Sequence, residues 1–227
     1  MSYSGSTEGH DREKRYVHVR LTVTLKPVIF PIDFLELLEV LKKQGYEPVV
    51  ELPSPSGGAR LVGSGTIAKR GEISVAADSQ RRFIGVDARS TGDAVSAFAE
   101  IVQAIRDGLW LDVRDQASYY EIIARMRVQG HANPAAAIGR FFQKLEGIGE
   151  IDSIIGEPVS LFTIRLIPKD KLPTDEEWFD IRIEPDVGLP QIAYAIEAIY
   201  RKSTWSQVEE FATTMESKID AILNKVE

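Results

Sequence analysis

The first regular pattern in the chain is an alternation of apolar and polar residues between Tyr16 and Val23. A period of two is typical of a strand with one buried face, so this segment predicts a strand whose inner side chains are Val17, Val19, Leu21 and Val23. After two prolines the apolar spacing changes to three and four residues, which predicts an amphipathic helix from about Ile32. The apolar face of this helix comprises Phe34, Leu37, Leu38 and Leu41, and Gly45 is expected to end it.

The same two patterns recur in the second half of the chain at nearly constant offsets. A second strand alternates through Ile122, Ala124, Met126 and Val128. A second helix is expected to begin at Asn133-Pro134 and to carry Ile138, Phe141, Phe142 and Leu145 before Gly149. A later strand and helix match as well, with Ile84, Val86, Val95, Phe98, Ala99 and Val102 answered by Ile181, Ile183, Ile192, Ala195, Ile196 and Ile199. We interpret these matches as an internal duplication; the alternative is that two amphipathic segments fall into partial register without common origin.

Shorter alternating segments between these blocks predict further strands. They are expected at 47–52, 60–68, 72–77 and 82–88, and then at 150–155, 159–167 and 178–184, with a loop at 168–175 in place of one strand. The connection 107–118 contains Leu109, Trp110, Leu111 and Val113 and is expected to be packed, so that the two halves share one sheet. The predicted organisation is a disordered tail (1–15), two pseudo-repeats (16–113 and 114–202) and an amphipathic helix (203–227).

The predicted fold class is therefore α+β. Two tandem pseudo-repeats of strand, helix, antiparallel strands and helix form a curved antiparallel sheet with helices on one side, plus a long C-terminal helix. This order resembles the TATA-binding-protein-like fold, most closely where EISVAADSQRRFIGVD (72–87) and ARSTGDA (88–94) lead into a helix ending near Ile105. DNA binders of that family insert phenylalanine wedges into the minor groove. The nearest candidates here are Phe83 and Phe162, of which only Phe83 falls on an outward register.

The last segment of the chain has an unbroken heptad pattern. Its apolar positions alternate in steps of three and four through Trp205, Val208, Ala212, Met215, Ile219, Ile222 and Val226. Two interpretations are open. The seam packs against the sheet or a helix of its own chain, or it pairs with a protein partner or a second subunit.

Composition narrows the class of protein. The 227 residues are 44% hydrophobic and 27% charged, which is ordinary for a globular chain and excludes a low-complexity or collagenous one. The chain has no cysteine, which excludes disulfides, thiolate nucleophiles and cysteine-ligated metals. No apolar run reaches the length of a membrane-spanning helix, and the polar N-terminus does not read as a signal peptide. A cytoplasmic protein without membrane contact is the expectation.

Candidate chemistry is sparse, and no enzyme signature, metal site or cofactor is predicted. The three histidines, His10, His18 and His131, are scattered. Gly63-Ser64-Gly65 lies in a strand pattern and lacks the lysine of a phosphate loop, so a bulge is the expected use. Asp175-Glu176-Glu177 lacks the spacing of a calcium loop, and a solvated turn is expected there.

The outward faces of the predicted strands share arginines, and these define the candidate surface. They are Arg20, Arg125, Arg127, Arg165 and Arg182, interleaved with Asp87, Glu121, Asp180 and Glu184. Guanidinium groups suit phosphates and carboxylates, but a net charge of −7 is not that of a duplex-DNA binder. The favoured hypothesis is a binding or scaffold module without catalysis. The alternatives are a nucleic-acid-binding protein using these arginines, and a small-molecule site or enzyme with an apolar cavity between sheet and helix.

Overall fold

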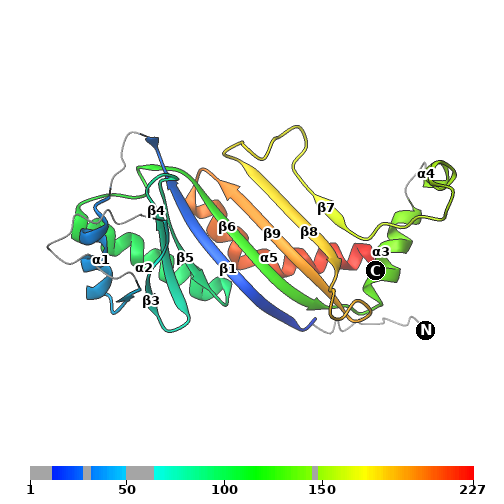
Figure 1. Ribbon diagram of the computed structural model, residues 1–227, viewed down its shortest axis with the longest axis horizontal. Helices are drawn as coiled ribbons and strands as arrows, with labels where there is room; N and C mark the ends of the chain where they lie inside the picture. Colours follow the sequence, from blue (N-terminus) through cyan, green and yellow to red (C-terminus); the bar gives the residue numbers. More distant parts are fainter. Residues whose placement is uncertain (1–11, 28–31, 50–63, 145–147) are drawn as a thin grey trace, which may run out of the picture.

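A curved nine-stranded antiparallel sheet forms the centre of the protein, as seen in a computed structural model that describes residues 12–27, 32–49, 64–144 and 148–227 (Figure 1). The strand order is β2-β3-β4-β5-β1-β6-β9-β8-β7. The elements along the chain are β1 (Lys14–Leu25), α1 (Phe34–Lys43), β2 (Glu47–Pro48), β3 (Ser64–Arg70), β4 (Ile73–Asp78), β5 (Phe83–Ala88), α2 (Thr91–Leu109), β6 (Ala117–Gln129), α3 (Pro134–Gln143), α4 (Ile148–Ile155), β7 (Ile164–Leu166), β8 (Trp178–Pro185), β9 (Ala193–Lys202) and α5 (Trp205–Val226).

The two longest strands, β1 and β6, pair in the middle of the sheet and join its two halves. Their inner side chains are fully buried, including Leu21 and Val23 from β1 and Ile122 from β6. The connection 107–118 leads directly into β6, and Val113 within it is also buried. One continuous sheet confirms the prediction that the two halves share a sheet, although Trp110 of the connection projects into solvent with 92% of its surface exposed.

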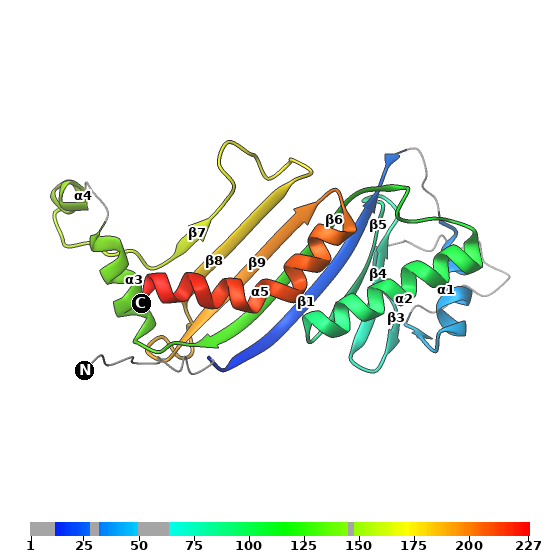
Figure 2. The same cartoon turned by 180° about the vertical axis from the view of Figure 1, so that it is seen from behind.

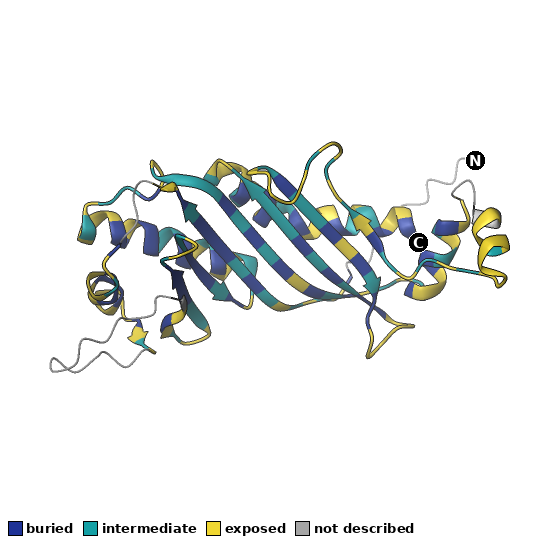
Figure 3. Ribbon diagram, turned by 45° about the horizontal axis from the view of Figure 1, so that its top comes forward, coloured by how far each residue is buried: buried dark blue, intermediate teal, exposed yellow. Residues whose placement is uncertain are grey.

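In the part of the chain that the structure describes, helices cover only one face of this sheet (Figure 2). The long helix α2 packs on β5 and β1, and α5 packs on β9 and β6. α1 lies beside α2, while α3 contacts β8 near the end of α5. Figure 3 shows the result along the central strands, where buried and partly exposed residues alternate because successive side chains point to opposite faces. We call the helix-free side the open face.

The C-terminal helix packs in cis. Val208, Ala212, Met215 and Ile219 are at most 2% exposed, so their side chains are not available to a second chain. Trp205 stacks on Phe98 of α2 with ring centroids 4.9 Å apart, and Ile222 is partly buried against the core. Phe211 and Leu223 are buried too, which widens the apolar stripe beyond a narrow heptad seam. A wide stripe is the pattern of a helix lying on a sheet rather than on one partner helix.

The order of elements is symmetric about the β1–β6 pair. Setting β2 and α4 aside, each half runs strand, helix, three antiparallel strands and helix. The predicted match between one closing helix at 95–102 and another at 192–199 is nevertheless wrong. Residues 192–199 lie largely in strand β9, and the element equivalent to α2 by order is α5. The common origin of the two halves stays a prediction.

Other elements and boundaries also differ from prediction. The segment 150–155 forms helix α4 rather than a strand, Gly149 lies inside α4, and α3 has already ended at Gln143. β7 is shorter than the predicted 159–167 segment. Residues 12–15 belong to the fold, because β1 begins at Lys14 and Arg12 is buried. Leu145, the second half of the 47–52 strand, the start of the 60–68 strand and residues 1–11 lie outside the described residues.

A group of ion pairs attaches the start of β1 to the end of α5. Arg12 donates to the carboxylate of Glu227 at 2.9 Å, and Lys14 lies 2.7 Å from a carboxylate oxygen of Asp220. The Tyr16 hydroxyl donates to Glu216 at 2.9 Å, and burial raises the pKa of this phenol above its ordinary value. These three side chains point toward the helices, so polar residues continue the inner face of β1 on the N-terminal side of Val19.

Among the described residues, no helix is both long enough and apolar enough to cross a membrane.

The close approach of β5 to β1 predicts that Gly85→Ala is destabilising. A Cβ atom at Gly85 would lie 2.5 Å from Cγ2 of Thr22 and 2.7 Å from the backbone oxygen of Leu21. Overpacking of this kind costs about 1–3 kcal/mol, and we expect a loss of that size in urea unfolding. Gly92→Ala is the matched control, because only Ser90 comes within 4.0 Å of the added Cβ in α2. It should be neutral or raise the unfolding free energy by about 0.5–1 kcal/mol. Equal effects of the two substitutions would contradict the argument.

Candidate functional site

Strand register places the predicted arginines together on the open face. Antiparallel pairing puts His18 of β1 opposite Arg125 of β6, and Arg125 opposite Glu197 of β9. Glu197 in turn faces Arg182 of β8, which faces Arg165 of β7. One row of charged residues therefore crosses five strands. Arg20 lies in the neighbouring row with Asp180, and Arg127 lies one row away on the other side.

Each of these arginines contacts a carboxylate of the same face. Arg20 binds Asp87 through two nitrogens at 2.7 and 3.1 Å. Arg125 donates to Glu197 at 2.6 Å, and Arg182 lies 3.2 Å from the other oxygen of Glu197. The remaining pairs are Arg127 with Asp186, Arg165 with Asp180, Arg182 with Glu184 and Arg201 with Glu121.

This pairing makes the open face a set of paired opposite charges, which we call the charge ladder, rather than a basic patch. Several of the arginine side chains are 40–61% exposed, so each pair contributes only about 0–1 kcal/mol to stability. The carboxylates are better covered than the arginines, with Asp87 at 14% and Asp180 at 13% exposure. A phosphate at any of these guanidinium groups would lie beside a carboxylate that repels it. The ladder therefore favours a partner that itself carries both signs of charge.

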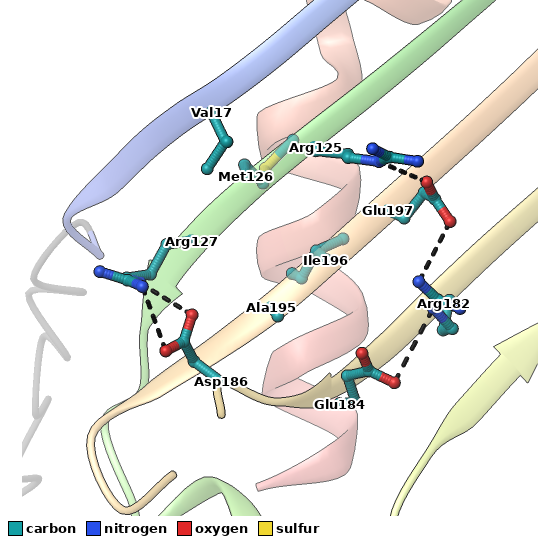
Figure 4. Close-up of a pocket in the computed structure, with 10 residues that line it drawn as sticks. All are labelled: Val17, Arg125, Met126, Arg127, Arg182, Glu184, Asp186, Ala195, Ile196 and Glu197. Carbon is teal, nitrogen blue, oxygen red and sulfur yellow. Dashed lines mark hydrogen bonds and ion pairs between the residues drawn. The ribbon is translucent and has the colours of Figure 1, made fainter. Parts of the chain in front are cut away.

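A β-bulge in β1 interrupts the ladder with an apolar side chain. The pairing of β1 with β6 shifts between Tyr16 and His18, so Val17 is an extra residue and turns to the open face. Val17 is 66% exposed, which corrects its predicted place in the core. It borders a shallow hollow of about 180 Å³ (Figure 4). The hollow is lined by Val17, Arg125, Met126, Arg127, Arg182, Glu184, Asp186, Ala195, Ile196 and Glu197.

Asp186 fixes one wall of this hollow. Its carboxylate accepts from Arg127 at 2.8 and 3.1 Å and from the backbone N–H groups of Gly188 and Leu189. Burial alone would raise the pKa of Asp186, but these donors outweigh it and hold the pKa below its ordinary value. The turn after β8 and the guanidinium of Arg127 are thus held in one arrangement beside Val17.

The other sequence candidates take structural roles. His18 Nε2 lies 2.6 Å from Asp87, and His131 is an exposed bend residue. Gly65 has a φ of +115°, and the bulge in β3 falls between Thr66 and Ala68. His10 and Gly63 lie outside the described residues.

The acidic turn before β8 is held by lysines. Glu177 accepts from Lys171 at 3.0 Å and from Lys202 at 3.2 Å. These two ammonium groups lower the pKa of the Glu177 carboxyl. Within the described residues no group of three or more acidic, histidine or cysteine side chains is arranged to hold a metal ion.

The two phenylalanine candidates do not form a pair of wedges. Phe83 lies on the open face beside Thr24 and is half-buried. The alternation predicts a core position for Phe162, but this residue is 55% exposed because β7 begins only at Ile164.

Hollows between the sheet and the helices are small or open. The one beside Phe98, Tyr120 and Trp205 has essentially no free volume, because the three rings pack on one another. A groove of about 300 Å³ beside α5 has Phe179, Tyr200 and Phe211 in its lining and Gln207, Glu210 and Lys218 among its polar residues. Tyr200 and Phe211 stack across it at 4.1 Å. The enclosed apolar cavity required by the small-molecule hypothesis is not found at either place.

Comparison of the chain with models of protein families and with curated proteins gave no match.

The Arg127–Asp186 pair generates a pH-dependent prediction. Arg127→Gln removes the cation from the buried carboxylate of Asp186, and we expect it to lower the unfolding free energy at neutral pH by about 1 kcal/mol after allowance for solvent screening. Because the folded-state pKa of Asp186 is depressed, its contribution is complete above the ordinary aspartate pKa of about 3.9 and is lost as the pH falls through the folded value. The difference between wild type and variant in urea unfolding should therefore shrink in acid.

Arg15→Gln is the matched control for this measurement. Arg15 lies opposite Arg127 on the same face and, within the described residues, forms no ion pair. Its substitution should change the unfolding free energy little at any pH. A pH-independent loss in Arg127→Gln, or an equal loss in Arg15→Gln, would contradict the assigned role of the pair.

Proposed function

We propose that the chain is a binding module that holds a protein partner on the open face of its sheet, with Val17 at the centre of the contact. The observation that carries this proposal is the bulge that turns Val17 out among paired charges. In protein interfaces a few central side chains often supply most of the binding energy, and the groups around them exclude water. Val17 and the aliphatic stems of Arg125 and Arg127 supply such an arrangement.

The charge ladder supports a polypeptide as the ligand. A protein surface carries carboxylates and cations in alternation and can exchange contacts with both members of an Arg–Asp or Arg–Glu pair. Arg125 and Arg182, which share Glu197, are the clearest case, because either guanidinium can accept a partner carboxylate while the other keeps Glu197 paired. The large, helix-free area around them offers room for a contact of ordinary protein–protein size.

Site-directed photocrosslinking tests this proposal in cells that express the protein. A crosslinking amino acid in place of Val17 should capture a defined partner, and the same residue in place of Trp110 should not, although Trp110 is 92% exposed at the end of α2. The captured protein is then purified, and its affinity is measured for wild type, Val17→Asp and Trp110→Asp. We expect Val17→Asp to weaken binding at least tenfold, which corresponds to about 1.4 kcal/mol. Equal affinity of both variants, or equal capture at both positions, would overturn the proposal.

Nucleic acid is the competing ligand, and it makes a different prediction. Binding to phosphates strengthens as salt is removed, because counterions are released. With its arginines already paired to carboxylates, the protein is expected not to change the fluorescence anisotropy of labelled duplex DNA or single-stranded RNA at low salt. Salt-sensitive binding that is lost in the double variant Arg125→Glu/Arg182→Glu would replace the protein partner with a nucleic acid.

A further inference from the structure

The strand β7 is an unpaired edge of the sheet. It pairs with β8 on one side and, within the described residues, with no strand on the other. An edge strand presents a row of N–H and C=O groups that another strand can bind. Natural proteins usually protect such edges with charge, proline or a covering element, and β7 has only Arg165 in its three residues.

Apolar side chains gather around this edge. Nearly half of the exposed large hydrophobic residues in the described part of the chain lie between positions 151 and 172, namely Ile151, Ile154, Ile155, Phe162, Ile167 and Leu172. Phe162 is 55% exposed and Ile167 is 50% exposed, and they flank β7 on its two sides. Helix α4, which carries the three isoleucines, projects from the body at the same end of the molecule (Figure 1). Concentrated exposure of this kind is typical of an interaction surface.

The sequence of the edge is complementary to itself. The segment Leu161–Ile167 reads LFTIRLI, and its apolar pattern is the same in both directions about Ile164. We propose that β7 pairs antiparallel with β7 of a second copy of this chain, about a two-fold axis at Ile164. A two-fold contact uses one patch on both subunits, which is what a palindromic pattern provides.

The register follows from the symmetry. Ile164 faces Ile164 of the second copy, Phe162 faces Leu166, and Leu161 faces Ile167, so each apolar residue meets an apolar residue. Arg165 faces Thr163, which avoids a pair of like charges, and it keeps Asp180 as its own partner at 2.6 Å. Apolar cross-strand pairs of this kind stabilise a sheet. Shifting the axis to Arg165 would oppose the two arginines and is disfavoured.

The isoleucines of α4 supply further area. A stable interface buries about 800 Å² on each partner, and pairing of one short strand covers only part of that. Ile154 is 81% exposed and Ile155 is 61% exposed, and these side chains stand at the end where the second copy arrives. The inference is independent of the proposed function, because it uses the β7 edge and not the open face around Val17.

Mass in solution tests the proposal. Sedimentation equilibrium of the full chain, over a wide range of concentration, should show association from 25.3 kDa to twice that mass. Phe162→Lys places a charge opposite Leu166 of the second copy and should weaken dimerisation at least tenfold, whereas Val187→Lys adds the same charge elsewhere and should leave it unchanged. Ile154→Asp should weaken it as well. Unchanged circular dichroism and thermal unfolding of the monomer establish that each variant is folded.

Cysteine pairs test the register, since the chain has no cysteine of its own. Phe162→Cys and Leu166→Cys are prepared separately and then mixed. The mixture should form an intersubunit disulfide on oxidation, because these two positions face each other and a disulfide needs Cα atoms about 4.4–6.8 Å apart. Neither variant alone should crosslink. A strict monomer, a dimer equally weakened by Val187→Lys, or crosslinking that is the same with and without mixing would overturn the proposal.

Discussion

The pairing of β1 with β6 is the contact on which the rest of the structure depends. Each strand belongs to one half of the chain, and each would be the edge of a five- or four-stranded sheet without the other. Their inner faces carry Val19, Leu21, Ile122 and other fully buried residues that α2 and α5 cover together. The same register sets the outer face, because His18 lies opposite Arg125 only when Leu21 lies opposite Ile122. Core packing and the charge ladder are thus two consequences of one alignment.

Much of this arrangement could be predicted from local patterns, and the failures have identifiable causes. The alternation in β1 and β6, the helix starts at Asp33 and Asn133, and the buried stripe of α5 all follow from period and capping. The sequence predicts a helix at 192–199, where the structure has β9, because the apolar residues there fit both the helical period and the strand period. Ile192, Ala195, Ile196 and Ile199 fit a helical stripe, while Tyr194, Ile196, Ala198 and Tyr200 alternate. Only the neighbouring strands β6 and β8 decide in favour of the strand.

The residues of the candidate surface could be predicted from the sequence, but their ion pairs could not. Strand parity is enough to place Arg20, Arg125, Arg165 and Arg182 on one side of the sheet. Which carboxylate each one meets depends on long-range register, which no local pattern encodes. The bulge at Val17 is a further example, because a single extra residue leaves the alternation in the sequence intact while it reverses the direction of the side chain. That reversal changes the interpretation of the face from a solvated charge array to a surface with an apolar centre.

The central place of β1 also has a kinetic consequence. Both of its neighbours, β5 and β6, come later in the chain. β5 follows α1 and the strands β2 to β4, and β6 follows α2 as well. Folding therefore requires closure of long loops before the innermost strand gains either partner, and chains rich in such non-local pairing fold slowly. During synthesis the central strand of the sheet emerges before both of its partners and has neither to pair with. A nascent chain of this topology has an unpaired central strand until β5 and β6 are made. An unpaired strand of this kind is prone to aggregation, so the order of the strands makes protection during synthesis important.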